Sequence, residues 1–202
     1  MLLNNFGVDK EGCYMLPEDE GVYIYIEGSW QKYITEGPFV PEVDGVYILY
    51  FRNIKCPGCK TFDKIWSEFI STYTTAANYA VIQCNNFFIE CSDYTASNSF
   101  IFYLVFETPQ VVVVVIENGT PVYIEREVGV LSMNELIDFV LNIKERMSMY
   151  LVEEPSEEGE GIYVDLSKKN WKDIVDQLKK IIFGGKIPQE LCTDEGCRIV
   201  IE

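Results

Sequence analysis

Hydrophobic positions divide the middle of the chain into short apolar runs that alternate with longer amphipathic stretches. The apolar run 46–51 precedes a stretch in which apolar residues recur every three or four positions, so a strand followed by a helix is predicted. The run 79–84 predicts a second strand. A second helix is expected within 92–105, with Ser92 or Asp93 as its N-cap.

The pattern continues with a strand that is apolar on both faces. Residues 111–116 read Val-Val-Val-Val-Val-Ile, which is typical of a central strand in a sheet covered on both sides. Asn118-Gly119 predicts a tight hairpin turn, and 122–128 predicts the returning strand. Ser132 and Glu135 then form a capping-box pattern. It introduces one helix that buries Leu136, Phe139, Val140, Ile143 and Met147.

These patterns divide the chain into three parts. Residues 46–150 are expected to form a complete α/β module. Residues 1–45 form an N-terminal extension, in which 22–26 and 30–34 predict a β-hairpin. Residues 151–202 form a C-terminal extension.

The C-terminal extension combines three kinds of segment. The acidic run 153–165 predicts a solvated linker. An amphipathic helix follows over 171–182, with Ser167 as its expected cap and Gly184 at its end. We expect this helix to pack on the α/β module. A cysteine-containing tail then leads into an expected strand over 198–201.

Charge and composition exclude several classes of function. The 202 residues include 16 Lys and Arg and 32 Asp and Glu, which gives a formal net charge of −16. Such a polyanion is repelled by nucleic-acid phosphates and anionic membranes, so neither is expected as a partner. The chain contains no His, which excludes Ser-His and Cys-His catalysis and His-ligated metals. The N-terminus lacks a basic region and a long apolar stretch, so we expect a cytoplasmic protein.

The seven cysteines are the side chains that we expect to carry the chemistry of this protein. Such a number is typical of some thermophilic cytosolic proteins. Cys56-Pro57-Gly58-Cys59 lies between a predicted strand and a predicted helix. With Cys56 at the N-cap, Cys59 lies one turn further on, within reach of a disulfide. The positive end of the helix favours a thiolate on Cys56, and three cations are expected nearby, namely Arg52, Lys55 and Lys60.

Four motifs in order resemble the thioredoxin family over about residues 40–148. They are the strand before Cys56-Pro57-Gly58-Cys59, the Thr108-Pro109 pair, the Glu117-Asn118-Gly119 hairpin and the segment 128–132 that leads into the last helix. The resemblance implies a thioredoxin-like α/β fold, in which helices flank a central mixed sheet. The N-terminal hairpin and the C-terminal helix are additions to it.

The resemblance also implies the roles of individual residues. Cys56 matches the attacking thiol and Cys59 the resolving thiol. Pro109 matches a cis-proline that packs against the disulfide, and Thr108 the residue whose backbone pairs with a substrate peptide. The implied substrate-binding residues are Pro57, Gly58, Thr108 and Pro109. The implied function is thiol–disulfide exchange on protein substrates, with electrons from a reductase or a partner dithiol and with no metal or organic cofactor.

Three positions depart from the thioredoxin pattern. Pro57-Gly58 reverses the usual Gly-Pro order, Lys55 replaces a tryptophan, and Tyr50 stands where thioredoxins keep a buried Asp. These departures leave both directions of redox work open, reduction and oxidation.

Other readings of the Cys-x-x-Cys motif remain open. The pair could form a structural disulfide, or half of a zinc site completed by Cys192 and Cys197. In a second functional hypothesis the chain is a protein-binding module whose Cys-x-x-Cys is structural or vestigial.

The remaining cysteines also allow alternatives. Cys84 and Cys91 are expected as free core thiols or as a stabilising disulfide. Cys192 and Cys197 either close a small loop or form a second dithiol that exchanges electrons with the first pair. Cys13 could pair with any of these.

Overall fold

The structure is a computed structural model that describes residues 15–150 and 170–201. Cys13, Ser167 and the acidic run 153–165 lie outside the described residues. Within the described ranges, no helix has both the length and the apolar character needed to cross a membrane.

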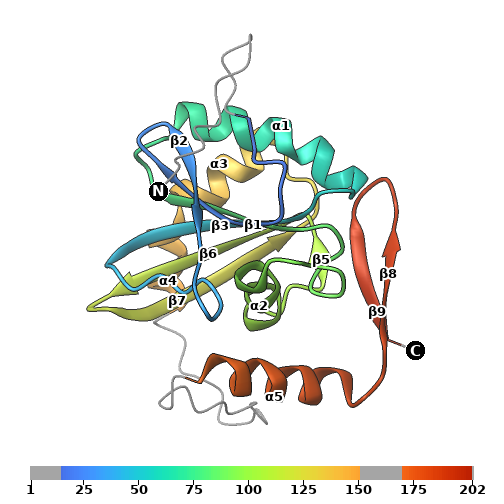
Figure 1. Cartoon of the computed structure of the whole chain (residues 1–202). Coiled ribbons are helices and arrows are strands. Elements are labelled where there is room, and N and C mark those ends of the chain that lie inside the picture. Colours follow the sequence, from blue (N-terminus) through green and yellow to red (C-terminus); the bar gives the residue numbers. More distant parts are fainter. Residues whose placement is uncertain (1–14, 151–169, 202) are drawn as a thin grey trace.

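A six-stranded mixed sheet forms the centre of the molecule, with strand order β2-β1-β4-β3-β6-β7 (Figure 1). Strands β3 and β4 are parallel, and every other neighbouring pair in this sheet is antiparallel. The N-terminal hairpin joins the sheet through β1, which pairs with β4. The strands are β1 (Gly21–Ile26), β2 (Ser29–Tyr33), β3 (Gly45–Asn53), β4 (Asn78–Cys84), β6 (Gln110–Glu117) and β7 (Thr120–Val128).

Helices cover both faces of the sheet. On one face, α1 and α3 bury an aromatic cluster that includes Trp66 and Phe139. On the other face, α2 packs against the sheet through Ala96 and Phe100. The amphipathic α5 then packs on α2, as the sequence predicts, with Ile174 and Leu178 in the contact. The helices are α1 (Pro57–Thr72), α2 (Tyr94–Phe102), α3 (Met133–Leu141), α4 (Ile143–Tyr150) and α5 (Trp171–Phe183).

The order β3-α1-β4-α2-β6-β7-α3 around this sheet is a thioredoxin-like fold, so the predicted fold class is confirmed. The local signals act as expected. Asp93 caps α2, the Ser132 capping box begins α3, and Asn118 and Gly119 have positive φ angles at the hairpin turn.

Two helix predictions are wrong in detail. The last helix of the module is interrupted at Asn142, the C-cap of α3, and continues as α4. The N-cap of α5 is Asn170, whose side chain accepts a hydrogen bond from the Asp173 amide, and not Ser167. Asn caps helices as well as Ser does, and Asn170 stands directly before Trp171, where the apolar face of the helix begins.

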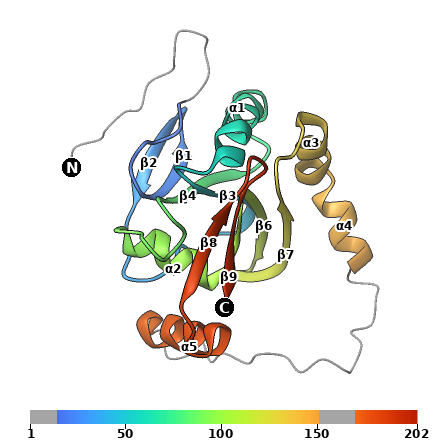
Figure 2. The ribbon, with the colours of Figure 1, turned by 90° about the vertical axis from the view of Figure 1, so that its right-hand side faces the viewer.

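A second, three-stranded sheet includes the C-terminal hairpin, which lies along the right-hand side of the molecule in Figure 1 and faces the viewer in Figure 2. The C-terminal strands β8 (Pro188–Cys192) and β9 (Cys197–Ile201) form a hairpin. Strand β9 also pairs antiparallel with the two-residue β5 (Glu107–Thr108), just before Pro109. The second sheet therefore joins the C-terminus of the chain to the loop that precedes β6.

Candidate active site

The Cys-x-x-Cys motif begins α1, as the sequence predicts. Cys56 is the N-cap and Pro57 follows at the first helical position, where its missing N–H costs no hydrogen bond. The Cys59 backbone N–H donates to Cys56 Sγ at 3.4 Å. Cys56 and Cys59 are free thiols, and both side chains are buried.

The cis-proline expectation is met at Thr108–Pro109. This peptide bond is cis, and the Thr108 carbonyl oxygen lies 3.6 Å from Cys56 Sγ, which donates to it. The structure therefore brings Cys56, Cys59 and Thr108 together, with Pro109 between β5 and β6. Pro57 is exposed, whereas Gly58 is buried.

The two thiols differ in acidity. A hydrogen bond from the Cys59 side chain, together with the Cys59 backbone amide, lowers the pKa of Cys56 to about 6, although burial acts in the opposite direction. Burial raises the pKa of Cys59 far above its usual range, and the hydrogen bond to Cys56 adds to this effect. With a pKa of about 6, Cys56 is mostly thiolate at pH 7, whereas Cys59 stays protonated.

The expected cations act on carboxylates and not on the Cys56 sulfur. Arg52 is buried and forms an ion pair with Asp63, with 2.9 Å between its Nη2 and Oδ2. Burial raises the pKa of both Asp63 and Glu190, and the rise is opposed by Lys60 at Asp63 and by Lys55 at Glu190. Hydrogen bonds, and not these cations, account for the lowered pKa of Cys56.

The sequence analysis did not identify Asp63 as a residue of the site. The Tyr50 hydroxyl donates to Asp63 Oδ1 at 2.9 Å and lies 3.3 Å from the Cys59 carbonyl oxygen. Burial raises the pKa of Asp63, while Arg52 opposes the rise. Tyr50 stands where thioredoxins keep a buried acid, and here it contacts an acid supplied by α1 instead. The available signal was an acidic residue four positions after Cys59, on the same helical face.

The C-terminal hairpin covers this site. A Cβ added to Gly58 would overlap the Glu195 carbonyl group, and one added to Gly196 would overlap the Thr108 carbonyl oxygen. The turn 193–196 is therefore in close contact with both the start of α1 and the cis-proline loop. The sequence left Cys192 and Cys197 either as the closure of a small loop or as a second dithiol for the first pair, but it did not indicate that the turn between them packs against the start of α1.

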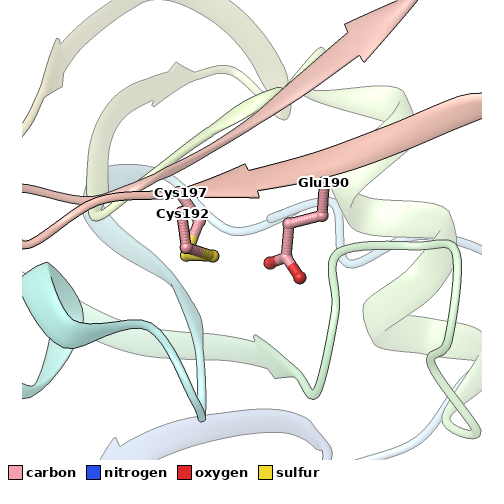
Figure 3. Close-up of side chains that lie close together, drawn as sticks. All are labelled: Glu190, Cys192 and Cys197. Carbon is pink, nitrogen blue, oxygen red and sulfur yellow. A yellow bond between two sulfur atoms is a disulfide. The ribbon is translucent and has the colours of Figure 1, made fainter.

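The other four described cysteines form two disulfides, Cys84–Cys91 and Cys192–Cys197. One group among the described residues could hold a metal ion, namely Glu190, Cys192 and Cys197 (Figure 3). Its two sulfurs are joined in the disulfide, so they offer no thiolate ligands in this state. The grouping contains neither Cys56 nor Cys59, so the structure does not assemble the four-cysteine zinc arrangement.

Comparison with known proteins adds little to this geometry. No protein-family model and no curated protein matches the chain. Among solved structures, oxidized thioredoxin O2 from Arabidopsis thaliana is similar to it, with 16% identity and a TM-score of 0.31. The match covers 52% of this chain and 75% of that chain. At this level the likeness supports no argument, and the fold assignment rests on the topology described above.

Proposed function

We propose that the protein is a thiol–disulfide oxidoreductase that acts on protein disulfides through Cys56 and Cys59. The observation that carries the proposal is the pairing of an acidic and a non-acidic thiol at the start of α1, opposite the cis Thr108–Pro109 bond. Such a pair separates an attacking sulfur from a resolving one.

The reaction begins when the Cys56 thiolate attacks a substrate disulfide and forms a mixed disulfide. Cys59 then loses its proton and attacks Cys56 Sγ, which releases the second substrate sulfur. We assign the acceptance of that proton to Asp63, a half-buried carboxyl one turn beyond Cys59 on α1 whose pKa is raised by burial. The same steps in reverse would oxidise a substrate dithiol, so a reductase or a partner dithiol decides the direction.

A substrate peptide would bind as an added strand. Thr108 offers a strand edge directly beside Cys56, where backbone hydrogen bonds can hold an extended peptide. Strand β9 occupies that edge through two register pairs, Glu107 with Arg198 and Thr108 with Cys197. So short a ladder can be displaced, and an external protein must displace it to reach Cys56.

The test is reduction of insulin disulfides by the full chain with dithiothreitol as electron donor. Wild type should precipitate insulin well before the uncatalysed reaction, and Cys56→Ser should remain at the background rate. A matched control, Cys84→Ser/Cys91→Ser, removes a disulfide that contains neither thiol of the Cys-x-x-Cys motif and should keep the wild-type rate.

Equal, background-level turbidity in wild type and Cys56→Ser would refute the proposal. That outcome would favour the alternative, a thioredoxin-fold binding module with a vestigial Cys-x-x-Cys.

A further inference from the structure

The C-terminal hairpin lies where a substrate strand would bind. Strand β9 pairs antiparallel with β5, with Cys197 opposite Thr108. The Ile199 amide extends this contact by donating to the Phe106 carbonyl at 2.7 Å. The hairpin therefore binds the cis-proline loop by strand addition, the mode by which an extended peptide would be recognised.

Two further contacts hold the hairpin in this place. The Asn53 amide at the end of β3 donates to the Glu190 carboxylate at 3.0 Å, which ties β8 to the central sheet. Phe183 at the end of α5 packs against Phe88 and Phe106, with ring centroids 5.3 and 5.9 Å away. Since α5 leads directly into the hairpin, this packing limits how far the hairpin can move.

The hairpin also carries a disulfide to the site. Cys192 and Cys197 are register partners that close the turn. Cys197 is only 3% exposed and belongs to the buried cluster that contains Cys56 and Cys59, whereas Cys192 is exposed. Cys197 is therefore buried in the same cluster as Cys56, and Cys192 lies at the surface.

We propose that the Cys192–Cys197 disulfide is an internal redox partner of the Cys56–Cys59 pair, attacked by Cys56 at the Cys197 sulfur. The inference rests on the proposed function, since it requires Cys56 to be an exchanging thiol. The hairpin is then both a substrate held in place by the fold and an exposed dithiol that exchanges electrons with external protein thiols.

The exchange balances within the chain. The Cys56 thiolate forms a bond to Cys197 Sγ, the Cys192–Cys197 bond breaks, and Cys192 leaves as a thiolate. Cys59 loses its proton and attacks Cys56 Sγ, and Cys197 leaves as a thiolate. The proton from Cys59 passes to Cys192 through solvent. Two electrons have moved from the Cys56–Cys59 pair to the hairpin, and the charge that began on Cys56 ends on Cys197.

Glu190 is placed to assist the leaving sulfur. A carboxylate oxygen of Glu190 and the sulfurs of Cys192 and Cys197 lie within 4.8 Å of one another. Figure 3 shows these side chains on the same side of the hairpin ribbon. The carboxyl group is therefore close enough to relay the proton that reaches Cys192 from solvent as the disulfide opens.

The test traps the first intermediate in the full chain. In Cys59→Ala the resolving thiol is absent, so attack by Cys56 should leave a Cys56–Cys197 disulfide and a free Cys192. The oxidised variant is incubated at pH 8, quenched in acid, alkylated and mapped by mass spectrometry. We expect the Cys56–Cys197 linkage in at least a tenth of the molecules, at least ten times more abundant than Cys56–Cys192.

Controls separate this inference from the proposed function. Cys56→Ser/Cys59→Ala should show no alkylation of Cys192, and Cys59→Ser serves as a second trap if Cys59→Ala does not fold by circular dichroism. An intact Cys192–Cys197 disulfide in every molecule of a folded trap would overturn the inference. If insulin reduction still depended on Cys56, the proposed function would stand alone. Trapping without insulin reduction would support the internal exchange and refute the proposed activity on protein disulfides.

Discussion

The contact between Gly196 and the Thr108 carbonyl offers a direct way to open the site. Cys56 is 1% exposed, and the hairpin turn packs against Gly58 and against the Thr108 carbonyl group that Cys56 contacts. Gly196→Ala would place a methyl group far inside 3.0 Å of the Thr108 carbonyl oxygen, a separation that real Cβ contacts essentially never show. The obstacle is backbone and does not rotate away, so β9 must retreat by roughly 1 Å or leave β5.

The expected size of the effect follows from the cost of such crowding. Overpacking costs about 1–3 kcal/mol, and here it destabilises only the covered state, in which the hairpin turn contacts the Thr108 carbonyl. The open state, in which the hairpin has moved away from Thr108, should therefore become about 5- to 150-fold more populated. Because alkylation of Cys56 requires the open state, its rate should rise by the same factor.

The assay is the rate at which iodoacetamide modifies Cys56 in the reduced full chain, followed by mass-spectrometric mapping of the Cys56 peptide. Glu195→Ala is the matched control, because the Glu195 side chain is exposed and its removal adds no atoms to the contact. It should react within twofold of wild type. A folded Gly196→Ala protein that reacts at the wild-type rate would refute the idea that the hairpin controls access to Cys56.

Three further changes test other parts of the site and fold. Cys59→Ala removes the largest cause of the lowered Cys56 pKa, so the midpoint of the alkylation pH profile should move upward from about 6, and an unchanged midpoint would contradict that cause. Asp63→Asn leaves the buried Arg52 charge without its partner and should lower the free energy of unfolding by about 3 kcal/mol in urea titrations; no loss would mean that water already screens the pair. Ser132→Ala removes the α3 cap and should cost about 1 kcal/mol in the same titration, with unchanged insulin reduction as its control.

The pH dependence of Cys56 has a definite sign. Below a pKa of about 6 the sulfur is protonated and unreactive, and above it the thiolate is already formed. Alkylation in the opened variant should therefore rise between pH 5 and pH 7 and then level off, as measured by the same peptide mapping. An ordinary thiol titrates near pH 8.5, so a profile still rising steeply there would contradict the assignment.

Much of the fold follows from interactions between near neighbours in the chain. Periodic apolar residues define α1, the Asp93 and Ser132 caps begin two helices, and Asn118-Gly119 turns the hairpin. Each signal acts over a few residues and can be read without knowing what lies nearby in space. The break at Asn142 shows the limit, because apolar spacing continues through it and does not reveal where a helix is interrupted.

Some features of the candidate site could likewise be predicted from the sequence, and others could not. The sequence by itself determined the two sulfurs and their spacing of one helical turn, since helix geometry carries that information, and the resemblance to thioredoxins implied a role for Pro109 beside them. Only the tertiary structure decided that Asp63 meets Tyr50, that Gly58 must leave room for the Glu195 carbonyl, and that Cys197 joins the buried cluster around Cys56. These contacts join segments far apart in the chain, and their partners are chosen by packing and strand pairing, which no local pattern of residues contains.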